Sequence, residues 1–356
     1  MNTKQLKTIT AKQFAKKILS FYDQQGRKDL PWQQDINAYR VWVSEIMLQQ
    51  TQVKTVIPYY LKFMDSFPTL DSLANADIDQ VLQHWAGLGY YSRARNLHAC
   101  AKQVVEQYQG EFPRDLESIV SLPGIGESTG GAILSLTHDL PEAILDGNVK
   151  RVLARVFLVD GWYGTSKVSK KLWSLSRQYT PHKRTGDFNQ AMMDLGADIC
   201  NRAKPRCSEC PLSTDCAAYL DNKTADYPHR KPRKTIPTKQ ATLHLITNDR
   251  NQIQLIKRPP SGIWGGLWSL PEIDNYDNEL DDCDQISAID NFKHTFSHFH
   301  LEAKVVHNVD FTNLTGLNLQ RLEDNSQLAW HNVSQLDELA LPTPIKTFLY
   351  KQFNLK

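Results

Sequence analysis

The spacing of apolar residues changes character about two thirds of the way along the chain. From residue 10 to about residue 220, apolar side chains recur every three or four positions between Gly and Pro breaks, which predicts a succession of helices. From residue 241 onward, short runs alternate between apolar and polar residues, which predicts strands. We therefore expect a mainly α N-terminal region followed by a smaller α+β domain.

In the first region, Val41, Trp42, Ile46 and Met47 fall on one face of a predicted amphipathic helix, and Pro58 is expected to kink or end the helix that follows. Further helices are predicted over residues 78–85 with Asp77 as the cap, over residues 92–110, after the glycine-rich turn at residues 124–126, and over residues 149–159.

In the second region, residues 242–247 and 253–256 predict two strands joined by a turn at Asn248-Asp249. Later strands are expected near residues 301–309 and 329–330, with one or two helices after Ser334. Between the regions, residues 222–240 hold several Lys and Arg, three prolines and few apolar residues, which is typical of a linker. We therefore predict a helical domain over 1–221, a linker over 222–240 and a second domain over 241–356.

The composition is compatible with this division. A chain of 356 residues with 41% hydrophobic and 22% charged residues favours a globular protein of two domains. No run approaches the ~20 apolar residues of a membrane span, and the N-terminus lacks the apolar core of a secretory signal. We expect a cytoplasmic protein with no membrane partner. The net charge of +2 neither requires nor excludes nucleic acid.

Four of the six cysteines lie within seventeen positions, with six, two and five residues between them: Cys200, Cys207, Cys210 and Cys216. Four thiolates on a compact loop can surround one soft metal centre, and their spacing alone does not distinguish an iron–sulfur cluster from zinc. Cys100 and Cys283 are interpreted as ordinary buried cysteines.

A second motif is the run Leu122-Pro123-Gly124-Ile125-Gly126, which is followed by Ser128 and a predicted helix. The glycines allow a tight turn between two helices, and the amide groups at the start of the second helix can hold a phosphate. The simpler alternative is a turn without a ligand.

A third feature is the carboxylate pair Glu45 and Asp146. Glu45 lies on a predicted helix among apolar neighbours, and burial favours its neutral form. Asp146 precedes the helix predicted from Val149, and a helix N-terminus favours the anion. Unlike surroundings of this kind suit glycosidic bond cleavage, which needs one acid and one anion. The alternatives are a surface glutamate and an aspartate that only caps a helix.

Several blocks together resemble the adenine DNA glycosylase (MutY) family within the helix-hairpin-helix, or endonuclease III, superfamily. They are Trp42-Val-Ser-Glu45-Ile-Met-Leu-Gln49-Gln-Thr-Gln, Gly87-Leu-Gly-Tyr90-Tyr-Ser-Arg-Ala-Arg, Ile144-Leu-Asp146-Gly-Asn148-Val and Phe188-Asn-Gln190-Ala-Met-Met-Asp-Leu-Gly, with the cysteine loop and the Pro-Gly turn. These blocks span most of the helical region.

The resemblance implies a helix-hairpin-helix glycosylase with a [4Fe–4S] cluster on Cys200, Cys207, Cys210 and Cys216. It implies that Glu45 protonates the adenine and later activates water, while Asp146 stabilises or transiently bonds the sugar with help from Asn148. The implied contacts to DNA or the flipped adenine are Gln49, Tyr90, Gln190, the turn residues Leu122, Pro123, Gly124 and Gly126, and Ser128.

Position 128 separates two kinds of enzyme in this superfamily. Bifunctional members carry a Lys there, which forms a Schiff base with the sugar and permits strand cleavage. The hydroxyl of Ser128 cannot form an imine, so we expect a monofunctional glycosylase.

The second domain resembles the MutT-like, or Nudix-like, C-terminal domain of this family. Within the block from His294 to His300, Phe296, Ser297 and His298 match a loop that recognises 8-oxoguanine. The alternative, a metal site of three histidines, is less economical because the cysteine loop already accounts for a metal. The Glu-rich box that a Nudix hydrolase needs for magnesium is absent after Gly265-Gly266-Leu267-Trp268. We expect this domain to bind a base and not to hydrolyse nucleotides.

These features predict a monomeric enzyme of base excision repair in the bacterial cytoplasm, associated with the nucleoid. It would act on double-stranded DNA with 8-oxoguanine:adenine or guanine:adenine mispairs, flip the adenine, and leave an abasic site. Three alternatives compete: a bifunctional glycosylase of the endonuclease III kind, a non-catalytic DNA-binding or redox protein, and a Nudix hydrolase.

Overall fold

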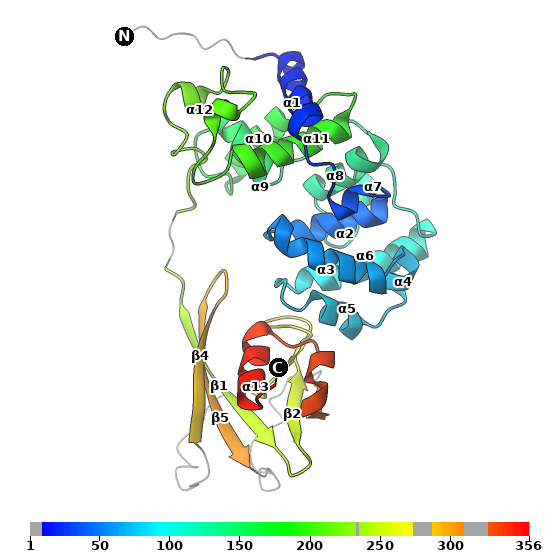
Figure 1. The fold of residues 1–356 in the computed structure, drawn as a ribbon, viewed down its shortest axis with the longest axis vertical. Coiled ribbons are helices and arrows are strands. Elements are labelled where there is room, and N and C mark those ends of the chain that lie inside the picture. Colours follow the sequence, from blue (N-terminus) through cyan, green and yellow to red (C-terminus); the bar gives the residue numbers. More distant parts are fainter. Residues whose placement is uncertain (1–8, 233–234, 273–286, 310–326, 356) are drawn as a thin grey trace. The chain divides into compact units, whose positions relative to one another are not determined.

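The computed structural model describes residues 9–232, 235–272, 287–309 and 327–355, and the chain divides into two compact units (Figure 1). The first unit comprises residues 1–75 and 96–233, and the second comprises residues 76–95 and 234–356. The sequence places residues 76–95 in the helical domain, whereas their contacts group them with the C-terminal residues. None of the described helices is long and apolar enough to span a membrane.

Helices make up most of the N-terminal region, as the apolar spacing predicts (Figure 1). They are α1 (Ala11–Gln25), η1 (Pro31–Gln33), α2 (Ala38–Leu48), α3 (Val53–Ser66), α4 (Leu70–Ala74), α5 (Ile78–Trp85), α6 (Ser92–Tyr108), α7 (Leu116–Val120), α8 (Glu127–His138), α9 (Gly147–Val156), α10 (Ser166–Tyr179), α11 (Thr185–Asp194), η2 (Leu195–Ile199), η3 (Cys207–Glu209) and α12 (Ala217–Leu220).

Of the two outcomes expected at Pro58, a kink or an end, the helix does not end there, because α3 continues through it to Ser66. The proline ring lies on the exposed side of the helix, while Val56, Tyr60 and Phe63 are buried on the other side. Burial of this apolar face outweighs the backbone hydrogen bond that the proline removes.

One core of the first unit forms where α1, α9, α10 and α11 pack together. Phe14, Ile18, Leu153 and Phe188 are almost fully buried there. Helix α8 packs against both α2 and α11. The helices that carry the predicted catalytic blocks are therefore fixed by direct packing within one unit.

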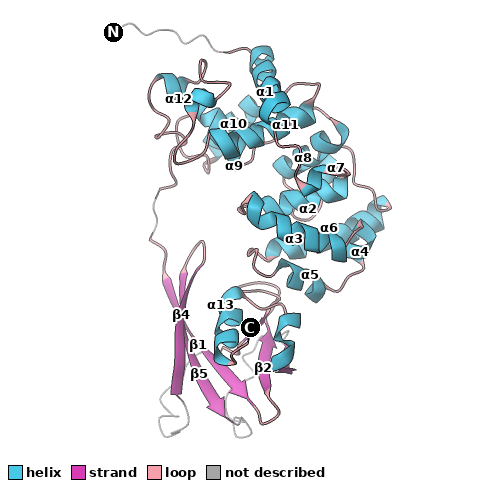
Figure 2. Ribbon diagram, in the orientation of Figure 1, coloured by secondary structure: helices cyan, strands magenta, loops and turns pink. Residues whose placement is uncertain are grey.

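The strands lie in the C-terminal region, as Figure 2 shows in magenta. They are β1 (Thr238–Thr247), β2 (Gln252–Lys257), β3 (Trp268–Ser269), β4 (Ser287–Thr295), β5 (His300–Val309) and β6 (Gln327–Asn332), and they are followed by η6 (Val333–Glu338) and α13 (Thr343–Gln352). Their order in the mixed sheet is β3-β2-β1-β5-β4, with β6 also paired to β2.

Strands β1 and β5 pair in parallel along their whole length, from Thr238 opposite His300 to Thr247 opposite Val309. Strands β4 and β5 form an antiparallel hairpin whose last pair is Thr295 and His300. The sequence predicts β1, β2, β5 and β6 but not β4 or β3, and β1 begins inside the predicted linker. The predicted recognition block from His294 to His300 therefore lies across the end of this hairpin.

Candidate active site

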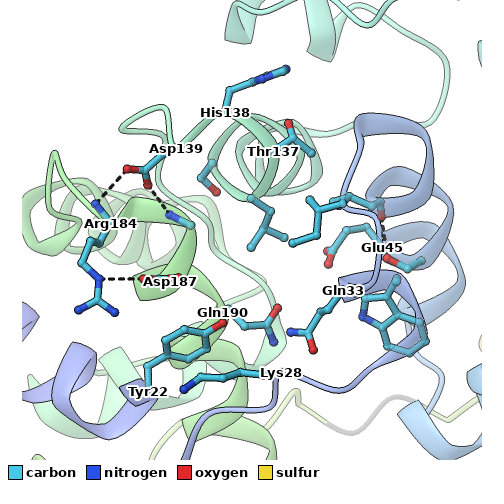
Figure 3. Close-up of a pocket in the computed structure, with 17 residues that line it drawn as sticks. Tyr22, Lys28, Gln33, Glu45, Thr137, His138, Asp139, Arg184, Asp187 and Gln190 are labelled. Atoms are coloured by element: carbon cyan, nitrogen blue, oxygen red, sulfur yellow. Dashed lines mark hydrogen bonds and ion pairs between the residues drawn. The ribbon is translucent and has the colours of Figure 1, made fainter. Parts of the chain in front are cut away.

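A cavity of about 560 Å³ opens in the first unit (Figure 3). Its wall is built from α1, η1, α2, α8 and α11, with Glu45 contributed by α2 and Gln190 by α11 (Figure 3). The lining residues are Tyr22, Lys28, Trp32, Gln33, Ile36, Val41, Ser44, Glu45, Ser135, Leu136, Thr137, His138, Asp139, Arg184, Gly186, Asp187 and Gln190. This volume lies in the range of small-molecule sites in proteins.

Glu45 is held at the cavity wall by a helix whose neighbouring residues, Ser44 and Ile46, are buried. Burial, together with the nearby negative charge of Asp146, raises the pKa of Glu45 to about 7. A glutamic acid with this pKa carries its proton for a large fraction of the time at neutral pH. The prediction that Glu45 sits in surroundings that favour the acid agrees with this geometry.

Asp146 is the N-cap of α9, and its carboxylate is held at both oxygens. The backbone N–H of Val149 donates to Oδ1 at 2.8 Å, and the side-chain amide of Asn148 donates to Oδ2 at 3.0 Å. Burial raises the pKa of Asp146, whereas these donors and the positive charge of Arg151 lower it. The helix N-terminus favours the anion, as the sequence predicts, but desolvation opposes it and is the larger effect.

The two carboxyl groups nevertheless have unlike surroundings. Both influences on Glu45 raise its pKa, while Asp146 has several hydrogen-bond donors that stabilise its ionised form. When the two carboxyl groups together hold a single proton, that proton is on Glu45 and Asp146 is ionised. These surroundings are compatible with the predicted acid role of Glu45 and anion role of Asp146, and both roles stay predictions.

Arg151 connects this pair to the cysteine loop. Its guanidinium donates to the side-chain oxygen of Asn148 at 2.8 Å, to the carbonyl oxygen of Gly196 at 2.7 Å and to that of Cys200 at 2.6 Å. Asn148 is thus held on both sides, by Arg151 at its oxygen and by Asp146 at its nitrogen. The sequence analysis missed Arg151, because a single arginine in a helix is usually solvent-exposed.

The cysteine loop begins where η2 ends. The guanidinium of Arg155, which is only 2% exposed, donates to Cys200 Sγ at 3.3 Å and to the carbonyl oxygen of Asn201 at 2.8 Å. Burial, with a contribution from the charges of the other loop thiols, raises the pKa of Cys210 to about 12 and that of Cys216 to about 11. The four thiols are therefore neighbours in space as well as in sequence.

These thiols match the donor set of an iron–sulfur cluster, which is held by four cysteine thiolates. A single zinc ion would need its ligands gathered within about 2.3 Å of one point. Among the described residues, no group of three or more His, Cys, Asp or Glu side chains is arranged to hold a metal ion. Four thiolates fit either a zinc ion or an iron–sulfur cluster in chemistry, and the identity of the metal stays a prediction.

The Pro-Gly turn joins α7 to α8 as expected. Leu122 is buried, Pro123 is partly exposed, and Gly126 caps α8. Gly124 has a φ of +76°, and a Cβ there would meet Cβ of Asn96 at 2.8 Å, so glycine is required. The turn has the form of a helix-hairpin-helix element, and its contact with DNA stays a prediction.

Ser128 lies in the first turn of α8, where its hydroxyl oxygen accepts a hydrogen bond from the backbone N–H of Leu145 at 2.9 Å. This bond fixes the segment immediately before Asp146. Ser128 was predicted as a DNA contact, and the structure shows that it also supports the catalytic segment from within the unit.

Three further predicted contacts are spread over the two units. Gln190 is buried at the cavity wall and donates to Asp194 Oδ1 at 2.9 Å, which orients its amide. Gln49 is the C-cap of α2. Tyr90 lies in the second unit, in the turn before α6, with a φ of +50° and a side chain that is 49% exposed.

The predicted 8-oxoguanine loop forms the tip of the β4–β5 hairpin. Backbone N–H of Phe296 donates to the carbonyl oxygen of Phe299 at 2.9 Å and closes the turn. Ser297 and His298 are exposed at the tip, while Phe296 stacks on the buried Phe299 with ring centroids 4.6 Å apart. The tip thus presents polar groups on an aromatic base. Cys283, predicted to be buried, lies outside the described residues.

Comparison with known proteins bears on these features directly. A model of the HhH-GPD superfamily of base excision DNA repair proteins matches residues 43–178, and a NUDIX domain model matches residues 242–351. An adenine DNA glycosylase of Buchnera aphidicola subsp. Acyrthosiphon pisum (strain APS) is 40% identical over 346 residues, which cover 94% of this chain and 96% of that protein. The chain belongs to the adenine DNA glycosylase family.

Membership of the adenine DNA glycosylase family confirms the predicted fold class and makes the protein a DNA N-glycosylase of base excision repair. The human adenine DNA glycosylase is 37% identical over 314 residues, which cover 73% of this chain and 57% of that protein. The alternatives of a Nudix hydrolase and a non-catalytic redox protein do not account for this similarity.

Solved structures match the helical part. A thermostable thymine-DNA glycosylase aligns with a TM-score of 0.52 and 29% identity over 59% of this chain and 97% of that chain. An endonuclease III in a non-covalent DNA complex aligns with a TM-score of 0.51 and 20% identity over 60% of this chain and 99% of that chain, which shows the fold alone.

Sequence reasoning missed several residues of this adenine DNA glycosylase that line the cavity beside Glu45. Trp32 is buried in η1, and Lys28 and Gln33 also line the cavity (Figure 3). The run Leu30-Pro-Trp32 signals a helical turn that begins with proline, but nothing in its spacing indicates a binding site. These residues meet Glu45 only through the tertiary packing of α1, α2 and α11.

Proposed function

We propose that the protein hydrolyses the N-glycosidic bond of adenine mispaired with 8-oxoguanine or guanine in duplex DNA, as a monomer, and leaves an abasic site. The observation that carries the proposal is the pair of carboxyl groups in the first unit. Glu45 lines the cavity with a pKa of about 7, and Asp146 lies close enough to influence it.

The reaction requires the adenine to leave the base stack, because the glycosidic carbon cannot be reached inside a duplex. The flipped base enters the cavity, where Glu45 transfers its proton to a ring nitrogen and makes adenine a better leaving group. As the bond to the sugar breaks, positive charge develops at the sugar carbon, and the Asp146 carboxylate stabilises it. Glu45 then accepts a proton from the attacking water.

Asn148 and Arg151 act as positioning residues in this scheme. Asn148 fixes one oxygen of Asp146 at 3.0 Å, and Arg151 fixes Asn148 at 2.8 Å. The carboxylate therefore keeps its orientation while charge develops, which is the requirement for electrostatic preorganisation.

We propose that strand cleavage does not accompany base release. A Schiff base needs an amine nucleophile, and Ser128 provides only a hydroxyl that already accepts from Leu145 N–H. Incubation with borohydride should therefore trap no covalent complex with DNA.

We assign recognition of 8-oxoguanine to the hairpin tip of the second unit. Ser297 and His298 offer exposed hydrogen-bonding groups, and Phe296 offers an aromatic face. In the same unit, the Glu272 carboxylate is paired with Arg258 at 2.5 Å. This pairing makes Glu272 a poor magnesium ligand and supports binding of a base without nucleotide hydrolysis.

We also propose that Cys200, Cys207, Cys210 and Cys216 hold a [4Fe–4S] cluster. When bound, the cluster would cross-link the loop through four thiolates, and Arg155 of α9 would stabilise the negative charge at Cys200. Elemental analysis and visible absorbance of the purified protein distinguish iron from zinc. Four zinc-bound thiolates with no iron would contradict the assignment.

The decisive experiment is single-turnover adenine release from three duplexes that carry 8-oxoguanine, guanine or cytosine opposite adenine. We expect release to be fastest with 8-oxoguanine, slower with guanine and negligible with cytosine. The Glu45→Gln variant should bind the 8-oxoguanine duplex but release adenine about 10²–10⁴-fold more slowly. Unchanged release by this variant would overturn the acid assignment, and equal rates on all duplexes would overturn the lesion specificity.

A further inference from the structure

The turn between β2 and β3 has contacts that neither base release nor nucleotide hydrolysis explains. This segment, residues 258–267, is called the bridging turn here. Arg95 Nη1 donates to the carbonyl oxygen of Gly265 at 2.5 Å. A Cβ at Gly266 would lie 3.5 Å from Leu82 and 3.7 Å from the Arg95 guanidinium, so the turn is packed directly on α5 and on the start of α6.

The same helical segment carries Tyr90 in a turn of its own. Trp85 Nε1 donates to the carbonyl oxygen of Gly89 at 3.2 Å, and Arg93 donates to Leu88 and Gly89 carbonyl oxygens at 3.1 Å each. The Arg93 guanidinium also lies 5.4 Å from the Trp85 ring and 5.6 Å from the Tyr90 ring. These bonds hold residues 87–91, the Tyr90 turn, in one conformation while the Tyr90 side chain is exposed.

The bridging turn contacts the hairpin tip through Trp264. This side chain is 7% exposed, and its ring lies 5.9 Å from Phe296 and 6.1 Å from His294. Phe296 in turn stacks on Phe299 at 4.6 Å. Adjacent residues of one short turn therefore face opposite ways, with Trp264 against the hairpin tip and Gly265 against Arg95.

Two contacts outside the turn strengthen the same attachment. Lys257 Nζ forms an ion pair with Asp79 at 2.6 Å, and Gln83 Nε2 donates to the carbonyl oxygen of Asp337 at 2.9 Å. Helix α5 is therefore held by β2, by η6 and by the bridging turn, all of which belong to the second unit.

We propose that the bridging turn couples the Tyr90 turn to the hairpin tip. The two elements would then contact the DNA strand that carries 8-oxoguanine as one rigid body. Arg95 and Trp264 are the positioning residues, and neither needs to touch DNA. This inference rests on the proposed function in one respect, the lesion specificity of the hairpin tip. The Gly265-Gly266-Leu267-Trp268 run would then serve to hold the two elements together. Its Nudix-like context would instead suggest a role in magnesium binding.

The first test does not depend on lesion specificity. Hydrogen exchange is measured in the free, full-length protein at the amides of Leu88, Arg93 and Arg95, which donate to Trp85, Tyr90 and Tyr91 carbonyl oxygens. Trp264→Leu should increase their exchange rates about tenfold, because loss of one packed contact in a coupled segment lowers its opening free energy. The matched control is Trp330→Leu, since Trp330 is 41% exposed on β6 of the same unit. Unchanged protection in the Trp264 variant, or equal loss in the control, would overturn the coupling.

The second test uses the preference for 8-oxoguanine:adenine over guanine:adenine in single-turnover adenine release. Arg95→Met removes the bond to Gly265 and should reduce the preference about tenfold, whereas Arg95→Lys, which keeps a donor, should restore most of it. The control Lys293→Met breaks an exposed ion pair with Glu302 on the same sheet and should leave the preference unchanged. A defect that only weakens folding lowers both rates equally, and that outcome would count against a positioning role.

The variants combine into a double-mutant cycle with Phe296→Leu. If the turn couples the two elements, Arg95→Met adds little to the loss already caused by Phe296→Leu, whereas independent elements give multiplicative losses. Multiplicative losses would overturn the proposal. A wild-type protein without any preference would instead contradict the lesion specificity, and the hydrogen-exchange comparison would still decide the coupling.

Discussion

The cavity of the first unit and the hairpin tip of the second unit handle polar groups in opposite ways. Glu45 at the cavity wall and Asp146 close to it are both enclosed enough for burial to raise their pKa values. At the hairpin tip, Ser297 and His298 are exposed, and their support is an aromatic cluster of Phe296, Phe299 and Trp264. Burial in the first unit changes the pKa values of the two carboxyl groups. The hairpin tip leaves its polar side chains accessible to a ligand without such a change in environment.

This difference indicates what each region contributes to the proposed reaction. Bond cleavage needs an acid and an anion whose proton affinities are set by their surroundings, and water must be excluded to set them. Recognition of a base needs accessible donors and acceptors in a fixed position. Substitutions in the cavity should therefore change rates on every substrate, and substitutions at the tip should change the preference between substrates.

The largest effect is expected from Asp146→Asn, which tests whether the cavity works through charge. Asparagine is as good a helix N-cap as aspartate, so α9 should persist, but the negative charge near the sugar is lost. We expect adenine release to slow by about 10²–10³-fold or more on both mispairs. Single-turnover kinetics and circular dichroism measure the two properties. A variant that kept its rate would show that Asp146 acts only as a cap.

The second effect concerns pH and sharpens the claim that burial sets the acid. Glu45 must be protonated to donate, so the rate should fall as pH rises above its pKa of about 7. It should fall again at low pH, where the Asp146 carboxylate takes up a proton, since burial raises its pKa. The alkaline loss should approach tenfold per pH unit, which gives about 50-fold between pH 7 and pH 9. The residual activity of Glu45→Gln should lack this dependence. A rate that falls only above pH 9 would contradict the assignment.

The same burial has a consequence for stability with a defined sign. The folded protein binds the Glu45 proton more tightly than the unfolded chain, whose value is 4.5. The stabilising contribution of this group is therefore complete below about pH 4.5 and is lost as pH rises to about 7. Glu45→Gln should be more stable than the wild type at pH 8, by about 3 kcal/mol, and equal to it near pH 4.5. Denaturant unfolding at the two pH values measures this difference.

A smaller effect is expected from Arg151→Met. This variant tests how far the rate of adenine release depends on the link between Asn148 and the cysteine loop. Loss of the bonds to Asn148, Gly196 and Cys200 frees Asn148 to move and loosens the hold on Asp146. We expect about a 10–100-fold lower rate on both mispairs. Lys17→Met is the control, because Lys17 ties α1 to the cysteine loop through Asp215 at 2.5 Å without contacting the catalytic residues. Equal losses in the two variants would point to loop anchoring in general.

The two regions also differ in how well the sequence predicts them. The helical region was predictable in outline because its apolar faces repeat and its ends carry capping residues, as with Asp77 at the start of α5. Glu45 and Asp146 were identified through blocks that resemble a known family. Their tertiary setting was not predictable, since Trp32, Lys28 and Gln33 reach Glu45 only after distant helices pack together.

In the second region, the local alternation of apolar and polar residues does not predict every element. Strand β4 was missed because Asp290, Lys293 and the neighbouring polar residues hide any apolar alternation on an edge strand. The attachment of residues 76–95 to the C-terminal unit was missed for a different reason. It depends on single contacts such as Asp79 with Lys257 and Arg95 with Gly265, which are 178 and 170 residues apart in the chain.

The smallest effect is expected at the exposed hairpin tip. Ser297→Ala removes one hydroxyl at the hairpin tip without disturbing the aromatic base formed by Phe296 and Phe299. Because a single net hydrogen bond is worth about 1 kcal/mol, the preference for 8-oxoguanine:adenine over guanine:adenine should fall about fivefold. The rate on guanine:adenine should stay the same, and Ser334→Ala, an exposed serine of η6 in the same unit, should change neither value. Equal slowing on both mispairs would mean that the tip affects catalysis itself, and the separation between a reacting region and a reading region would then fail.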